Sequence, residues 1–215
     1  MVHWIFLILV SLSVFSAPVL AEPVELVMPN KLTAKAEFHK GDPGKPTVLL
    51  MHGFLQTHEF PTIHRLAEGL ASAGYSVLAP TLTLGVTHRK QSLACEAIHT
   101  HTIQDGAKEL AVWLDWLKAR KASAIVLVGH SFGSVETLAY LSAYRDPLVR
   151  KLIGVSAVEG RLKVDGPRRE KLIKEIRALI KAHKKSLITE QFSFCQKYRA
   201  TPEWMLSYID IGTAH

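Results

Sequence analysis

The chain has 215 residues, of which 48% are hydrophobic, and its formal net charge at pH 7 is +7. This length and composition predict a single globular domain with an ample core. They exclude an intrinsically disordered chain and a fibrous protein.

The first segment of the chain is a predicted signal peptide. Residues 4–20 are almost wholly apolar and uncharged, and Val19 and Ala21 are small residues suited to cleavage. We therefore expect removal of residues 1–21 and a mature protein that is periplasmic or secreted. His3 stands where such segments usually carry Lys or Arg, and the apolar span is close to the minimum that crosses a bilayer. An uncleaved membrane anchor is therefore the alternative.

Apolar runs and turn residues predict how strands and helices alternate along the rest of the chain. We expect strands over residues 24–28, 32–39, 47–51, 75–79 and 152–158, and helices over residues 63–71 and 103–117. Residues 81–100 are predicted to form a polar loop. This alternation predicts an α/β fold, a three-layer α/β/α sandwich with a mostly parallel sheet and chemistry at the carboxyl ends of its strands.

The C-terminal part of the chain is strongly basic. Residues 168–185 predict an amphipathic helix with one apolar stripe, formed by Leu172, Ile173, Ile176, Leu179 and Ile180. Residues 186–195 and 207–211 look strand-like, and Thr201 is the predicted N-cap of a last short helix. Residues 161–199 contain twelve Lys and Arg against four acidic residues. Either a solvated helix face or contact with an anionic membrane surface would explain this excess.

The most specific motif is Gly129-His130-Ser131-Phe132-Gly133, which has the form Gly-x-Ser-x-Gly. An apolar run precedes it and a helical stretch over residues 134–144 follows it, which is the strand–turn–helix context of a nucleophile elbow. The glycines leave room for the helix to pack back against the strand. Ser131 is therefore the predicted nucleophile. The alternative is an ordinary glycine-rich turn of an α/β protein.

A second segment supports the elbow. Residues 47–51 end in His52-Gly53-Phe54-Leu55. Acyl transfer needs amide donors directed at the oxygen that becomes negatively charged, and the backbone N–H groups of Phe54 and Phe132 are the predicted oxyanion hole. With the His-Gly loop after its third strand and the elbow after its fifth, the segment from about residue 24 to residue 160 resembles the α/β-hydrolase superfamily. The resemblance implies a serine hydrolase of the esterase or lipase kind.

The resemblance also implies an acid and then a histidine after the serine, on loops that follow two further strands. Glu159 is the candidate acid, because some members of the superfamily take the acid from the end of the sixth strand. Asp210 and His215 have the right order but leave no room for a strand and a helix between them. The general base stays unassigned. We expect the other histidines to pack beside the site, to lie in loops or to be solvated: His52, His88, His99, His101, His130 and His183.

Two further expectations follow from the resemblance. Residues 167–185 occupy the position where similar hydrolases insert a lid helix, with a plain packing helix as the alternative. The missing last strands predict that the chain as written is an incomplete hydrolase, whose sheet ends at its sixth strand with one edge and one helix face uncovered. Oxyanion donors and binding alone would leave it only roughly a thousand- to ten-thousand-fold rate enhancement over water.

The chain has two cysteines, Cys95 and Cys195. In an exported protein an even number of cysteines predicts a disulfide. Cys95 lies in the polar loop and Cys195 follows the amphipathic helix, so both should lie above the active edge. In a cytosolic protein they would be two unrelated buried thiols.

These features predict an exported serine hydrolase that cleaves a small-molecule ester or related acyl substrate, with no cofactor and no metal site. Serine at the elbow argues against dehalogenase or epoxide-hydrolase chemistry, for which similar folds place aspartate. One alternative is a catalytically incomplete binding protein on the same scaffold. Another is a membrane-surface protein that acts through its basic helix. Nucleic acid is not an expected partner, because no aromatic residues interleave with the basic ones.

Overall fold

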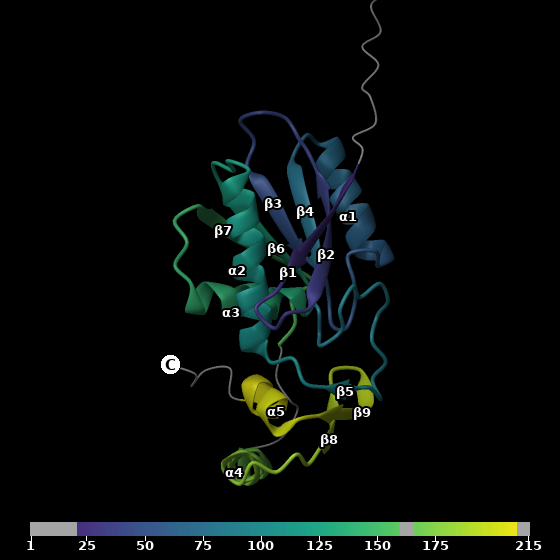
Figure 1. Cartoon of the computed structure of the whole chain (residues 1–215), viewed down its shortest axis with the longest axis vertical. Coiled ribbons are helices and arrows are strands. Elements are labelled where there is room, and N and C mark those ends of the chain that lie inside the picture. The colour runs from purple at the N-terminus through teal and green to yellow at the C-terminus, as the bar shows by residue number, and fades with distance from the viewer. Residues whose placement is uncertain (1–20, 160–165, 210–215) are drawn as a thin grey trace, which may run out of the picture.

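The structure is a computed structural model, and it describes residues 21–159 and 166–209 (Figure 1). The apolar segment predicted to be a signal peptide lies almost entirely outside these residues, as do Asp210 and His215. Within the two described ranges, no helix is long and apolar enough to cross a membrane.

Six strands form the main sheet, in the order β1-β2-β4-β3-β6-β7. They are β1 (Glu22–Val27), β2 (Thr33–His39), β3 (Thr47–Met51), β4 (Ser76–Thr81), β6 (Ile125–His130) and β7 (Val149–Val155). Strand β2 runs antiparallel to both of its neighbours, whereas β3, β4, β6 and β7 are parallel to one another. The predicted α/β fold with a mostly parallel sheet is confirmed.

Helices cover both faces of this sheet. Strand β3 is buried along its whole length, because successive side chains enter different layers. Val48 and Leu50 pack with α1 (Pro61–Ser72) on one face. Leu49 and Met51 pack on the other face with α2 (Ile103–Ala119), beside which lies α3 (Gly133–Ala143). The apolar runs read from the sequence therefore mark the centre of the core.

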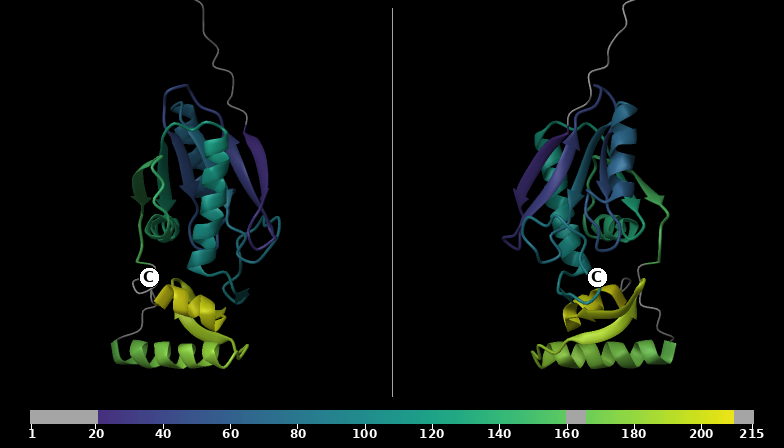
Figure 2. Two further views of the ribbon diagram at one scale, coloured as in Figure 1. Left: turned by 60° about the vertical axis from the view of Figure 1, so that its left-hand side comes forward. Right: turned by 90° about the vertical axis from the view of Figure 1, so that its right-hand side faces the viewer.

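Residues 166–209 form a cap over the carboxyl ends of the parallel strands (Figure 1). The cap consists of α4 (Gly166–Lys181), β8 (Ile188–Phe192), β9 (Cys195–Ala200) and α5 (Pro202–Ile209). Its hairpin joins the short strand β5 (Ile98–His99) in a second sheet of order β5-β9-β8. Figure 2 shows α4 lying crosswise at the end of the molecule, beyond the rest of the cap.

Several predicted boundaries in and near the cap were wrong. The segment over residues 207–211 was expected to be strand-like, but residues up to Ile209 belong to helix α5. Trp204, Met205 and Tyr208 are all buried on one side of that helix, and Thr201 caps it by accepting a hydrogen bond from the amide of Trp204. Helix α4 ends at Lys181 rather than residue 185, and β7 begins three residues earlier than predicted.

Strand β7 is an edge strand within the described ranges, where it pairs with β6 alone. Most of its residues are exposed or half-buried, including Ile153 at 46% exposure. Leu138 on α3 is likewise 55% exposed. The sheet of the described residues thus ends at its sixth strand, as expected, with apolar side chains left in contact with solvent.

Candidate active site

Ser131 lies at the turn between β6 and α3. Its φ of +52° places it in the left-handed region, which non-glycine residues rarely adopt. The Ser131 amide donates to the carbonyl of Val155 on β7 at 2.8 Å, so neighbouring strands hold this conformation in place. A strained serine fixed by the surrounding sheet is the geometry of a nucleophile elbow.

The two glycines of the motif are required by close backbone contacts. A Cβ atom at Gly129 would lie 2.5 Å from the carbonyl oxygen of Gly133, and one at Gly133 would lie 2.5 Å from the carbonyl oxygen of His52. Real Cβ atoms do not approach backbone this closely. The elbow and the loop after β3 are therefore in direct backbone contact, which brings the two predicted motifs together.

The amides of Phe54 and Phe132 are free to act as donors. Neither N–H group donates a hydrogen bond to another described residue. Phe132 also precedes the first turn of α3, where the helix dipole favours negative charge. The rings of the two residues lie 5.1 Å apart between their centroids, so the two loops are packed together. The arrangement has the free donors that an oxyanion hole requires.

Arg89 holds the loop that carries Phe54, a role that the sequence analysis missed. Its buried guanidinium donates to the carbonyl oxygens of Leu55 at 3.1 Å and Gln56 at 2.6 Å, just after Phe54. It also donates to the carbonyl oxygen of Leu82 at 2.9 Å. Burial lowers the pKa of Arg89 to about 10, so the side chain remains charged at neutral pH.

His52 is a structural histidine. Its Nδ1 lies 2.8 Å from the carbonyl oxygen of Gly53, and its Nε2 accepts the amide of Leu82 at 3.1 Å. The neutral ring must therefore carry its proton on Nδ1. Burial, together with the charge of Arg89, lowers the pKa of His52 to about 3. His52 cannot take a proton from Ser131, and the expectation that it packs beside the site fits this geometry.

Among the residues that the structure describes, no acid–histidine pair lies at Ser131. None of the described histidines makes a hydrogen bond with Ser131. His130 is half-buried, with an unpartnered Nδ1 and a pKa lowered by burial. His88 and His183 are exposed, and Glu159 is exposed four residues beyond the end of β7. The general base therefore stays unassigned among the described residues.

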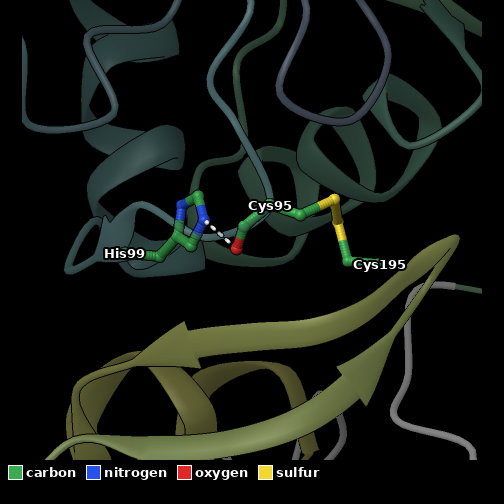
Figure 3. Close-up of a disulfide and its surroundings, with 3 residues drawn as sticks. All are labelled: Cys95, His99 and Cys195. Carbon is green, nitrogen blue, oxygen red and sulfur yellow. Dashed lines mark hydrogen bonds between the residues drawn. A yellow bond between two sulfur atoms is a disulfide. The ribbon is translucent and has the colours of Figure 1, made fainter.

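A disulfide joins Cys95 to Cys195, as the cysteine count predicted. It connects the loop after β4 to the first residue of β9 (Figure 3). His99 continues this attachment: its Nε2 lies 3.4 Å from the carbonyl oxygen of Cys95, its carbonyl accepts the Thr201 amide, and its ring stacks on Tyr198 at 4.0 Å. The cap is thus fastened to this loop by a covalent bond, a strand pairing and a ring stack.

Aromatic side chains of the cap pack against the rings of both residues of the candidate oxyanion hole. Phe192 packs against the rings of both Phe54 and Phe132, and Tyr208 packs against Phe132. A cavity of about 20 Å³, enough for one water molecule, lies between the cap and the loop after β3, and Ser131 is not among the residues that line it.

A buried carboxyl group lies beneath the cap. Glu136 on α3 accepts a hydrogen bond from the Tyr208 hydroxyl at 2.8 Å, and its other oxygen has no partner. Burial raises the pKa of Glu136 to about 8, so the carboxyl group is mostly protonated at neutral pH. The sequence analysis missed this residue, although a single acidic residue in an otherwise apolar helix after the elbow was a usable signal.

No cluster of three metal-ligating side chains occurs in the part of the chain that the structure describes. The described residues of the site supply a serine, two free amides and aromatic side chains that pack beside them.

Comparison with known proteins gives a consistent result. A family model described as "alpha/beta hydrolase fold" matches residues 46–181. Epoxide hydrolase A of Mycobacterium tuberculosis is 36% identical over 101 residues, which cover 44% of this chain and 27% of that protein. The chain thus spans about a quarter of the length of this curated relative.

Solved structures with similar folds are more distant in sequence. A hypothetical protein from Pseudomonas aeruginosa has a TM-score of 0.63 at 12% identity, covering 91% of this chain and 72% of that one. A thermostable carboxyl esterase from Bacillus coagulans has a TM-score of 0.58 at 16% identity, covering 77% of this chain and 52% of that one. At these identities the likeness concerns the fold alone.

Proposed function

The chain belongs to the alpha/beta hydrolase fold family, and on that premise we propose that it is a serine hydrolase that cleaves an ester or related acyl substrate through Ser131. The observation that carries the proposal is the left-handed Ser131 at the end of β6, next to two amides that donate to no other described residue. A plain glycine-rich turn needs neither feature. The nucleophile elbow of an α/β hydrolase that carries out acyl transfer has both.

The proposed reaction begins with attack of the Ser131 Oγ on the substrate carbonyl carbon. The carbonyl oxygen becomes an oxyanion, which accepts hydrogen bonds from the amides of Phe54 and Phe132. Expulsion of the alcohol leaves an acyl-serine, and water then attacks the acyl carbon and restores the serine.

The proton of Ser131 needs an acceptor, and His52 is excluded by its hydrogen bonds. Where no histidine serves, the oxyanion donors and binding would supply only roughly a thousand- to ten-thousand-fold acceleration. The unassigned base therefore favours a second candidate function, a binding protein that retains the scaffold without efficient turnover. Glu159 remains the proposed acid only if the cap or another segment presents a histidine between it and Ser131.

Epoxide hydrolysis is not proposed, although the curated relative is named for it. In similar folds that reaction uses a carboxylate nucleophile at the elbow, and residue 131 is a serine. We further propose export to the periplasm or the medium, because the disulfide is of a kind that persists in oxidising compartments.

A fluorophosphonate probe tests the proposal, because it reacts with an activated serine. We expect labelling of the parent chain, none with Ser131→Ala, and parental labelling with Ser142→Ala, an exposed serine on α3 that serves as the matched control. If the chain turns over p-nitrophenyl esters, Ser131→Ala should lower the rate by up to about a million-fold. An inert parent chain would favour the binding protein. Ester turnover by Ser131→Ala at the parental rate would disprove the nucleophile assignment.

A further inference from the structure

Two buried side chains beneath the cap each have one polar atom without a hydrogen-bond partner. His101 and Glu136 are only 5% and 4% exposed. The Nε2 atom of His101 and the Oε2 atom of Glu136 make no hydrogen bond with a described residue. Folded proteins rarely leave such atoms unsatisfied, because each one gives up the hydrogen bonds that it makes with water in the unfolded chain.

Both residues line the same cavity, which is the one of about 20 Å³ between the cap and the loop after β3. That volume suits a single water molecule. Much of the remaining lining is aromatic, including Phe132 and Trp204. Two further histidines of the lining already have hydrogen bonds, His52 with Gly53 and Leu82, and His99 with the carbonyl oxygen of Cys95. The unpartnered buried atoms at this cavity are therefore those of His101 and Glu136.

A glycine in the first turn of α2 brings Glu136 close to His101. A Cβ atom at Gly106 would collide with the Oε2 atom of Glu136, so this oxygen rests against the backbone of α2. His101 lies two residues before Ile103, the first residue of the same helix. The two unpartnered atoms thus belong to side chains at one end of α2, and no direct hydrogen bond joins them.

His101 presents a hydrogen-bond acceptor to this cavity. Its Nδ1 lies 3.7 Å from the Oε1 atom of Glu109, a buried residue of α2. Both oxygens of Glu109 accept hydrogen bonds, from the amide of Thr83 at 2.9 Å and from the side chains of Thr83 and Asn30. Burial lowers the pKa of His101, so the ring is neutral at neutral pH. Its single proton belongs on Nδ1 beside these acceptor oxygens, which leaves a lone pair on Nε2.

Glu136 presents a hydrogen-bond donor. Its Oε1 atom accepts the hydroxyl of Tyr208 at 2.8 Å. Because burial raises the pKa of Glu136 to about 8, the carboxyl group is mostly protonated at neutral pH. The proton belongs on Oε2, since Oε1 already accepts a hydrogen bond. A donor without an acceptor and an acceptor without a donor therefore line one cavity.

We propose that this cavity is a binding site for one water molecule, which accepts a hydrogen bond from the carboxyl group of Glu136 and donates one to the Nε2 atom of His101. Water does both at once, whereas a bound magnesium or calcium ion would need a larger set of oxygen ligands. The water completes a hydrogen-bonded connection from Tyr208 of the cap through Glu136 to His101. The inference does not depend on Ser131 chemistry, because a structural water requires no turnover.

A crystal structure of the full chain at neutral pH, at a resolution that shows ordered water, tests the site directly. We expect one density peak about 2.7–3.2 Å from both the Glu136 Oε2 and the His101 Nε2 atoms. Glu136→Gln keeps a donor and an acceptor and should retain the peak, whereas Glu136→Leu removes both and should lose it. No peak in the parent chain would overturn the proposal, as would a peak surrounded by ligands at about 2.0–2.6 Å, which are the distances of a bound cation.

Nuclear magnetic resonance of the ¹⁵N-labelled histidine rings tests the donor and acceptor assignment. We expect the ring of His101 to carry its proton on Nδ1 at neutral pH, both in the parent chain and in Glu136→Gln. The resonance is assigned by its disappearance in His101→Gln. A proton on Nε2 would contradict the proposed bridge, because the water would then face two donors.

A double-mutant cycle tests whether the two side chains are coupled. Glu136→Leu or His101→Leu alone removes one partner of the water, so the second change should then have a smaller effect. We expect the effects on the equilibrium constant of unfolding to depart from a simple product by at least about threefold. The control cycle combines Glu136→Leu with His64→Leu on α1, and its effects should multiply within about twofold. Simple multiplication in both cycles would refute the bridge.

Discussion

Replacement of Arg89 should both destabilise the chain and disorder the candidate oxyanion hole. Arg89→Met keeps the length of the side chain but removes every N–H donor. The carbonyls of Leu82 and Gln56 then lose the only donors that the described residues give them, whereas the carbonyl of Leu55 keeps the amide of Leu93 at 3.0 Å. Each unsatisfied buried carbonyl costs about 1–3 kcal/mol, so we expect a loss of about 4 kcal/mol in the free energy of unfolding.

Urea unfolding monitored by circular dichroism measures this loss. Arg89→Lys keeps the charge but not the fork of donors, so it should lose about half as much as Arg89→Met. Arg65→Met, at an exposed arginine on α1, is the matched control and should change the free energy of unfolding by less than about 0.5 kcal/mol. A loss below about 1 kcal/mol for Arg89→Met would refute the role of Arg89 in holding the loop that carries Phe54. Slower fluorophosphonate labelling of the folded Arg89→Lys protein would show that the Phe54 amide has moved.

Three further predictions concern the elbow, the disulfide and Glu136. Gly129→Ala should lower the free energy of unfolding by more than about 3 kcal/mol, because its Cβ would lie 2.5 Å from backbone atoms. The control Gly69→Ala, at an open position of α1, should raise it by about 0.5–1 kcal/mol. Similar values for both variants would contradict the close contact. Removal of the disulfide in Cys95→Ala/Cys195→Ala should lower the free energy of unfolding by about 4 kcal/mol on the chain-entropy model, since the bond closes a loop of 100 residues. A melting temperature unaffected by a reductant would disprove this. The pKa of Glu136 is raised to about 8 in the folded protein. The stability that this group contributes is therefore complete below its ordinary pKa near 4.5 and is lost as the pH rises towards 8, by at most about 5 kcal/mol. Unfolding titrations at several pH values should show this decline in the parent chain and a flatter profile for Glu136→Gln.

Parts of the fold could be predicted because their signals are local. The apolar run over residues 47–51 was predicted with its exact bounds, since a strand buried on both faces needs apolar side chains at every position. The elbow was predictable for a related reason, because two glycines at fixed spacing are needed wherever a helix packs this closely on a strand.

The missed features depend on contacts between distant segments. Residues 207–209 have a strand-like composition, but Tyr208 and Ile209 are held in a helix because they pack in the apolar cluster between the cap and α3. Arg89 lies in the segment that was predicted to be a polar loop, and two of the carbonyls that it binds, those of Leu55 and Gln56, are more than thirty residues away in the sequence. Local composition carries no information about such pairings.

The disulfide that attaches the cap has a consequence for how the protein acquires its disulfide during biosynthesis. Cys95 leaves the ribosome 100 residues before Cys195, so its thiol has no partner within the chain for most of translation. The chain contains no other cysteine. The only incorrect disulfides available to it are therefore bonds to another molecule. Failed biogenesis should accordingly yield covalent dimers on a non-reducing gel rather than scrambled monomers, and the yield of monomer should depend on how dilute the nascent chains are.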